Sequence, residues 1–189
     1  MHAICAAGAM ALCLASSAQA APVAYLLQAE TSSVGFETDF GREHVTGTFP
    51  LARADLTLDF DDVSKCHIDV TLDVRHVKAS FPFAAQALRG KEVLDAANHP
   101  EMHFVSTAVR AHGDSADVTG RITIRGVTRP VTLRATIFRQ TGQPAGDRSR
   151  LTVRLTGKVR RSEFGATGWA DLVGDEVRIV IDARIVAGG

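Results

Sequence analysis

Most of this chain alternates between apolar and polar residues, one position at a time. Near the C-terminus, for example, Ile179, Ile181 and Ala183 alternate with Arg178 and Asp182. A period of two places apolar side chains on one face of a β-strand and polar side chains on the other. Because most segments repeat this pattern, we expect an antiparallel sheet with one face in water. Such a sheet must close on itself or pack against a second sheet to bury its apolar face.

The alternating segments are separated by turn residues such as Gly, Asp and Pro, and they predict about eight to ten strands. These strands are expected at residues 25–29, 33–40, 44–49, 52–60, 66–74, 102–110, 117–125, 130–138, 150–160 and 176–186. A chain of this length suits one domain. We therefore predict an all-β fold, a single antiparallel up-and-down, lipocalin-like β-barrel of about eight strands. A sandwich of two sheets is the structural alternative.

A short helical insertion is predicted near residues 82–97, where the alternation stops. Residues 84–88 and 92–97 have helix-favouring compositions, and Gly90 separates them. The segment carries four large apolar side chains, those of Phe81, Phe83, Leu88 and Leu94. A helix this apolar is expected to cover an opening of the barrel as a lid. The alternative is a helix that plugs one end of the sheet core.

The N-terminal residues have the composition of a secretory signal. Residues 3–15 form an apolar run without charge, and the small residues Ala18 and Ala20 follow with the spacing of a cleavage site. The run is too short to span a bilayer. We predict a signal peptide at residues 1–20, cleavage near Ala20, a mature domain at residues 21–189 without a transmembrane segment, and a periplasmic or secreted location.

Cysteine usage and charge exclude several classes of protein. Outside the predicted signal, Cys66 is the only cysteine, so no internal disulfide is expected. It begins an apolar strand face, which favours a buried, inert thiol over a reactive one. The formal net charge is zero, which gives no signal for nucleic-acid binding. The second half has a basic excess, and charge pairs across a wet sheet face explain it better than an anionic partner.

No group of residues is typical of a catalytic or metal site. The stretch from His99 to His103 has the wrong residue order for a zinc-binding helix, and Pro100 fits the start of a strand. Asp61 and Asp62 end a strand, where a turn explains them. No G-x-S-x-G nucleophile elbow occurs. We therefore expect no enzyme activity, no metal and no cofactor.

The inward-facing positions include both small and large side chains. The small ones are Gly47, Ala54, Ala108, Gly120, Ala135, Gly157 and Ala183, and the large ones are Phe36, Phe49, Phe60, Phe104, Ile122 and Leu133. A packed barrel interdigitates large and small residues, whereas a hollow barrel leaves room for a ligand. The sequence leaves both possibilities open. Arg161 continues the inward phase of Val159, so it could meet a ligand headgroup or an internal carboxylate, or reach solvent at the strand end.

Several short motifs occur in a fixed order along the chain. They are Gly47-Thr48-Phe49, Val93-Leu94-Asp95 with His99-Pro100 and Phe104-Val105-Ser106, Gly126 to Leu133, Arg161-Ser162-Glu163-Phe164-Gly165, and Val173 to Val177. Each motif alone is weak, but the ordered set is specific. It resembles the YceI family of exported polyisoprenoid-binding proteins, and the resemblance covers residues 23–186.

The resemblance implies a lipocalin-like barrel with a tunnel for a long isoprenoid lipid, such as a quinone tail or a polyprenyl phosphate. It also implies a periplasmic or secreted location, and homodimers are possible. The chain differs from the family pattern in the helical insertion. Residues 84–87 read Ala-Ala-Gln-Ala, where family members often carry Arg-Asp and a His before the position of Leu88. A different lipid or a different mouth geometry is the expected consequence.

We therefore predict an exported carrier that holds an isoprenoid-type lipid and uses no cofactor. The expected ligand-binding residues are Phe36, Phe49, Phe60, Val74, Phe104, Ile122 and Leu133 in the tunnel wall, Phe81, Phe83, Leu88 and Leu94 in the lid, Arg161 as a headgroup partner, and Phe164. The alternative is an envelope interaction module with a packed barrel core and no lipid ligand. An enzyme that acts on a bound lipid lacks a credible nucleophile and base.

Overall fold

The structure is a computed structural model that describes residues 21–139, 142–144 and 146–188. The predicted signal peptide lies outside the described residues. The strands are β1 (Val23–Leu27), β2 (Ser33–Phe40), β3 (Glu43–Phe49), β4 (Leu51–Leu58), β5 (His67–Asp73), β6 (Lys78–Ala79), β7 (Glu101–His112), β8 (Ser115–Ile124), β9 (Val127–Arg139), β10 (Arg150–Arg160) and β11 (Val173–Ala187). The helices are α1 (Pro82–Arg89) and the 3₁₀ turns η1 (Ala29–Thr31), η2 (Val63–Lys65) and η3 (Arg161–Phe164).

Eight strands close into an antiparallel barrel, as the alternation predicts. Their order is β1-β4-β5-β7-β8-β9-β10-β11, and β11 pairs with β1 to complete the ring. The strands β2, β3 and β6 extend the wall on one side, because β2 pairs with β11 and β3 while β6 pairs with β3. Pro50 separates β3 from β4; it has no backbone N–H to donate to a sheet. The structural alternative of a two-sheet sandwich is therefore wrong, because all the described strands belong to one sheet that closes on itself.

The register between β10 and β11 shows how the sequence pattern becomes an inside and an outside. Leu155 lies opposite Ile181 with both side chains on the inner face. Arg154 lies opposite Asp182 on the outer face, where their side chains form an ion pair at 2.7 Å. Each strand therefore buries its apolar set and pairs its charges across the wet surface.

One predicted inward position is wrong. Ala108 is exposed, because the pairing of β7 with β8 shifts register between Ser106 and Ala108. An extra residue in one strand reverses the side on which the following side chains lie. Val109 consequently faces the interior in place of Ala108.

The helical insertion is shorter than predicted. The helix α1 ends at Arg89, and residues 92–97, which were expected to be helical, form turns. Gly90 leaves the helical conformation, and Asp95 has a positive φ of 50°. The backbone N–H groups of Leu94 and Ala96 then donate to the last carbonyls of α1, at Leu88 and Arg89. The chain thus folds back on α1 instead of continuing it.

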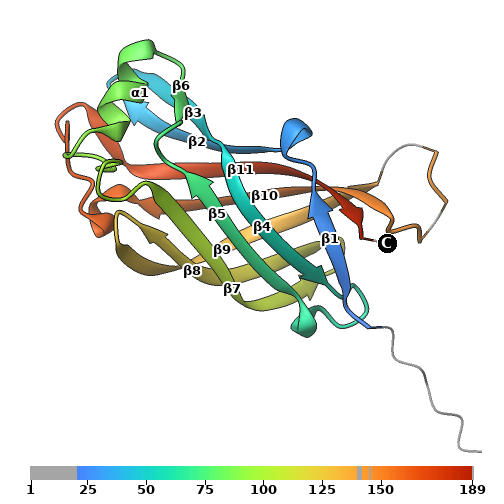
Figure 1. Ribbon diagram of the computed structural model, residues 1–189. Coiled ribbons are helices and arrows are strands. Elements are labelled where there is room, and N and C mark those ends of the chain that lie inside the picture. The colour runs from blue at the N-terminus through green and yellow to red at the C-terminus, as the bar shows by residue number, and fades with distance from the viewer. Residues whose placement is uncertain (1–20, 140–141, 145, 189) are drawn as a thin grey trace, which may run out of the picture.

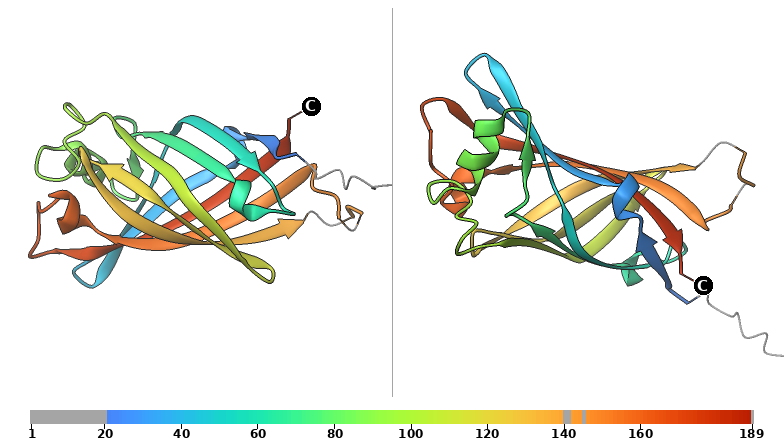
Figure 2. Two further views of the ribbon diagram at one scale, coloured as in Figure 1. Left: turned by 90° about the horizontal axis from the view of Figure 1, so that it is seen from below. Right: turned by 45° about the horizontal axis from the view of Figure 1, so that its top comes forward.

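The two ends of the barrel are built differently (Figure 1). At one end lie α1, residues 90–100, η3 and residues 165–172, and both views in Figure 2 show these segments close together. At the other end lie η2 and residues 146–149, which precede β10. Buried residues form three clusters near the wall and the ends, rather than one solid centre.

Candidate functional site: an apolar cavity inside the barrel

The barrel interior is hollow. A cavity of about 410 Å³ runs inside it, and its wall is made almost wholly of carbon atoms. Inward side chains in the middle of the barrel, such as Val153, Leu155 and Ile181, are only half-buried, because they face open space rather than other side chains. The structure therefore decides between the two interiors that the sequence left open.

Glycines in the wall keep this space open by accommodating large neighbours. A Cβ atom at Gly47 would lie 2.5 Å from the ring of Phe36, and one at Gly120 would lie 2.5 Å from the ring of Phe104. A Cβ atom at Gly157 would similarly lie 2.5 Å from Cδ2 of Leu133. Each large side chain thus lies over a neighbouring glycine, along the wall instead of across the barrel. Large side chains therefore pack against small residues of the same wall, and not against side chains from the opposite side of the barrel.

Most of the predicted binding residues line the cavity. These are Phe36, Phe49, Phe60, Phe83, Leu88, Leu94, Phe104, Ile122, Leu133, Arg161 and Phe164. Val74 does not, because it follows the end of β5 and is only 1% exposed, within a cluster that includes Leu94 and Phe164. Phe81 also lies off the cavity wall, where it stacks on Phe83 with 5.7 Å between ring centroids.

Other lining residues were not singled out from the sequence. Leu155, Ile179 and Ile181 belong to the clearest alternating strands, so their phase could have placed them in the wall. Trp169 and Leu172 also line the cavity, but they lie in the loop between η3 and β11. No periodic pattern predicts the direction of side chains in such a loop.

Arg161 borders the cavity, but backbone carbonyls occupy its guanidinium group. Nε donates to the oxygen of Gly174 at 3.0 Å, and Nη2 donates to that of Val173 at 2.9 Å. Nη1 donates to Ala166 and to Gly168, each at 2.7 Å. Four of the five N–H groups of the side chain are therefore used. Arg161 holds the loop after η3 in place, a role that the alternating pattern does not predict.

A second arginine connects this loop to the segment after α1. The guanidinium of Arg125 donates to the carbonyl of Gly165 and, at 2.8 Å, to that of Lys91. The N–H of Gly168 donates to the carbonyl of Glu92 at 2.8 Å. Two segments that are far apart in the sequence are thereby joined at one end of the barrel.

This end of the cavity is its mouth. Phe83 from α1 is 62% exposed, and Trp169 and Leu172 from the loop after η3 are 61% and 51% exposed, yet all three also line the cavity. A side chain that meets both the interior and the solvent lies at an opening. The turn between β2 and β3 reaches the same place, since Gly41 donates to the carbonyl of Leu172 at 2.9 Å. We call Phe83, Trp169 and Leu172 the collar.

At the far end, aromatic and cationic side chains cover part of the cavity, although Ile137 of β9, which lines the cavity, is 38% exposed there. Phe60 lies edge-on to Tyr25 with 5.9 Å between ring centroids. The guanidinium carbon of Arg148 lies 5.2 Å from the centre of the Phe60 ring, and the Tyr25 hydroxyl donates to the carbonyl of Arg148 at 2.9 Å. These contacts join the segment after β4 to the segment before β10.

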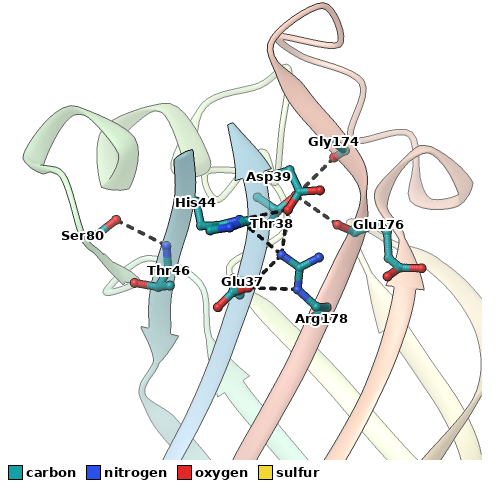
Figure 3. A network of polar contacts seen from close by, with 9 residues as sticks. All are labelled: Glu37, Thr38, Asp39, His44, Thr46, Ser80, Gly174, Glu176 and Arg178. Atoms are coloured by element: carbon teal, nitrogen blue, oxygen red, sulfur yellow. Dashed lines mark hydrogen bonds and ion pairs between the residues drawn. The ribbon is translucent and has the colours of Figure 1, made fainter. Parts of the chain in front are cut away.

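A polar network fixes the wall beside the mouth, where β2 meets β11 (Figure 3). On the outer face, Nη2 of Arg178 lies 2.7 Å from Glu37 and 2.7 Å from Asp39. Hydrogen bonding to Arg178 lowers the pKa of the Asp39 carboxyl. On the inner face, the hydroxyl oxygen of the buried Thr38 lies 3.2 and 3.0 Å from the carbonyl oxygens of Gly174 and Glu176, which share its one proton. Thr38 thus binds backbone carbonyls of β11 at the place where its pairing with β2 shifts register.

Comparison with known proteins agrees with this architecture. A family model described as a YceI-like domain matches residues 25–185. The chain belongs to the YceI-like family. Protein YceI of Salmonella arizonae is 31% identical to this YceI-like chain over 144 residues, which cover 76% of the chain and 75% of the relative. Protein YceI of Salmonella enteritidis has the same identity and coverage.

Solved structures share the fold of this YceI-like domain. BcnA of Burkholderia cenocepacia superposes with a TM-score of 0.75 at 24% identity, over 84% of this chain and 99% of that one. A polyisoprenoid binding domain from Saccharophagus degradans superposes with a TM-score of 0.65 at 13% identity, over 88% of this chain and 99% of that one. At such identities the likeness establishes the barrel, and no more.

Several titratable side chains of the YceI-like domain contact other protein groups. Within the described ranges, no three His, Cys, Asp or Glu residues are grouped to hold a metal ion. His103 contacts Asp69 at 2.8 Å. Cys66 borders the cavity half-buried, and burial raises the pKa of its thiol. The helices of residues 21–139, 142–144 and 146–188 include none long and apolar enough to cross a membrane.

Proposed function

We propose that this chain is a carrier that binds the tail of an isoprenoid-type lipid, such as a quinone or a polyprenyl phosphate, inside the barrel. The observation that carries the proposal is the hollow, carbon-lined cavity with its mouth at the collar. The structural likeness to a polyisoprenoid binding domain supports the same ligand class. The apolar segment at residues 1–20 supports export to the periplasm.

Apolar burial supplies the main favourable free energy for binding a lipid tail. Each methylene removed from water contributes about 0.8 kcal/mol. Ten methylenes in the cavity would contribute about 8 kcal/mol before entropic costs, which corresponds to a dissociation constant near the micromolar range. A cavity of about 410 Å³ also falls within the range of small-molecule sites.

The wall is suited to recognise a tail rather than a headgroup. The Thr38 hydroxyl is bound to carbonyls, and Arg161 has four of its N–H groups bound to carbonyls. A headgroup is therefore best placed at the collar, outside the wall. Tail length and width then determine selectivity, and quinones and polyprenyl phosphates of equal tail length bind with similar affinity.

We also propose that the chain binds its lipid without changing it. Catalysis of hydrolysis or transfer needs a nucleophile within reach of a base. Here the Cys66 sulfur contacts the backbone of Asp59, and His103 contacts the carboxylate of Asp69. The alternative of an interaction module required a packed core, and the cavity argues against that core.

The test is lipid capture by the purified protein. Mass spectrometry of an organic extract is expected to show an isoprenoid lipid at about one molecule per chain. Protein freed of lipid is then expected to bind quinones of long tail at roughly micromolar concentration. The matched variants are Leu155→Trp, which fills the cavity, and Thr156→Trp, its outward neighbour. A lipid-free protein that takes up no quinone, or equal uptake by both variants, would contradict the proposal.

A further inference from the structure

We propose that the collar docks on the surface of a lipid bilayer, and that lipid enters and leaves the cavity through this contact. The proposal rests on the proposed carrier function and adds the partner with which the lipid is exchanged. Phe83, Trp169 and Leu172 are exposed to solvent and at the same time continue the apolar wall of the cavity. An exposed apolar surface of this kind marks a place that meets another apolar phase.

The two segments that carry Phe83 and Trp169 have no charge. Residues 79–88 and 164–170 contain no Asp, Glu, Lys or Arg, although these types make up 22% of the chain. The exposed Asp171 lies next to Leu172, and its carboxylate has to stay on the water side of the contact. Contact with the apolar part of a membrane is costly for charged groups and not for these segments. Charge complementarity therefore favours an uncharged, apolar partner, and attraction to anionic lipid contributes little.

The size of the collar favours a bilayer over a folded protein. Three side chains of these types expose roughly 350 Å² when about half to two-thirds of each is accessible. A stable protein interface needs about 800 Å² on each partner. Shallow insertion at the membrane interface needs only a few apolar anchors, and Trp is enriched at that depth.

The loop that carries Trp169 and Leu172 is held in one conformation. Arg161 binds carbonyls on both sides of Trp169, at Gly168 and at Val173. The N–H of Gly168 also fixes the loop to Glu92. A preformed collar loses little conformational freedom on docking. Contact with the bilayer also lets the lipid tail leave the cavity without crossing water. In water, each methylene that becomes exposed would slow the release of the lipid about fourfold.

Trp169 is the only tryptophan of the chain, so its fluorescence reports directly on the collar. The experiment adds the mature protein to zwitterionic phosphatidylcholine vesicles with brominated acyl chains. We expect the emission to shift to the blue and to be quenched by the bromine atoms. Because both segments are uncharged, the binding should be the same in about 0.5 M salt, where surface charge interactions are screened.

Variants distinguish binding through the collar from non-specific adsorption of exposed apolar side chains. Phe83→Ser and Leu172→Ser are each expected to lower the vesicle partition coefficient about tenfold, as loss of a buried apolar side chain predicts. Phe138→Ser is the matched control, since Phe138 is an exposed aromatic residue (48%) on β9 outside the cavity wall. Because Trp169→Ser has no tryptophan, its binding to vesicles is measured by flotation. An equal loss for Phe138→Ser would overturn the proposal.

Delivery of an isoprenoid quinone from detergent distinguishes this proposal from the carrier function. If the protein retains the delivered quinone but Trp169 is not quenched by brominated vesicles, the docking proposal is overturned and the carrier function stands. If the protein retains no quinone, the carrier function itself fails. If the protein binds only to vesicles that contain a reconstituted envelope protein, the proposal that the collar docks on a bilayer is overturned, and the partner is a protein.

Discussion

Single residues determine the width of the cavity. Gly157 lies in β10, and Cδ2 of Leu133 occupies the space where a Cβ atom would be. The glycines at 47 and 120 hold Phe36 and Phe104 against the wall in the same way. A methyl group at any of these positions must move its neighbour. At Gly157 the closest neighbour is the flexible end of a side chain, so Leu133 can turn towards the open interior. The backbone oxygen of Thr132, at 3.2 Å, then has to move by only a few tenths of an ångström.

Gly157→Ala is therefore expected to narrow the cavity with little loss of stability. Overpacking a filled core costs about 1–3 kcal/mol, but here the displaced Leu133 has empty space to enter. We expect the unfolding free energy to change by less than about 1 kcal/mol. The affinity for long-tailed quinones should fall about tenfold relative to short-tailed ones. Quinone titrations and urea unfolding measure both effects. Thr156→Ala, on the outer face, should leave the tail preference unchanged.

At the scale of elements, the mouth depends on the loop after η3, which Arg161 and Arg125 hold by hydrogen bonds to its carbonyls. The segment from η3 to the start of β11 has backbone hydrogen bonds of its own, donated by Gly165, Ala166, Leu172 and Val173. Arg161 binds four further carbonyls there. The sequence predicted correctly that this arginine continues the inward phase, because it follows Val159 by two residues. Its partners could not be predicted, because they depend on how the loop folds back over the strand end.

Arg161→Lys should loosen this loop. A lysine ammonium cannot reproduce the planar arrangement of donors that serves four carbonyls. Leaving partly buried carbonyls without donors is expected to lower the unfolding free energy by about 2–3 kcal/mol. Acrylamide quenching of Trp169 should increase, because Trp169 lies in the loop. The matched control is Arg160→Lys, at an exposed neighbouring position. Unchanged quenching in Arg161→Lys would show that the loop has other sufficient support.

At the scale of the whole molecule, carboxylates paired on the outer surface connect strands and turns around the barrel. Hydrogen bonds from Arg75 lower the pKa of Asp73, and those from Arg178 lower the pKa of Asp39. Backbone and hydroxyl bonds from Ser162 lower the pKa of Asp175. Groups whose pKa is lower in the folded chain contribute stability above their unfolded pKa, which is about 3.9 for Asp.

The barrel should therefore lose stability in acid. As the pH falls below about 4, the unfolded chain takes up protons before the folded one, and the contribution of these carboxylates is lost progressively. Urea unfolding at pH 7, 4 and 2.5 is expected to show a falling midpoint. Asp73→Asn should lower the midpoint at pH 7 and flatten its decline with acid. A midpoint that rises between pH 4 and 2.5 would contradict this interpretation.

The sequence by itself determined which face of each regular strand is apolar. That property depends only on the two-residue period of a strand, and it was enough to predict the antiparallel barrel and most of the wall. It failed at Ala108, where a bulge in β7 reversed the phase. Only the tertiary structure decided that the interior is hollow, that Arg161 serves its own loop and that Trp169 stands at the mouth. These features depend on side chains and loops from distant parts of the chain, whose distances no local pattern encodes.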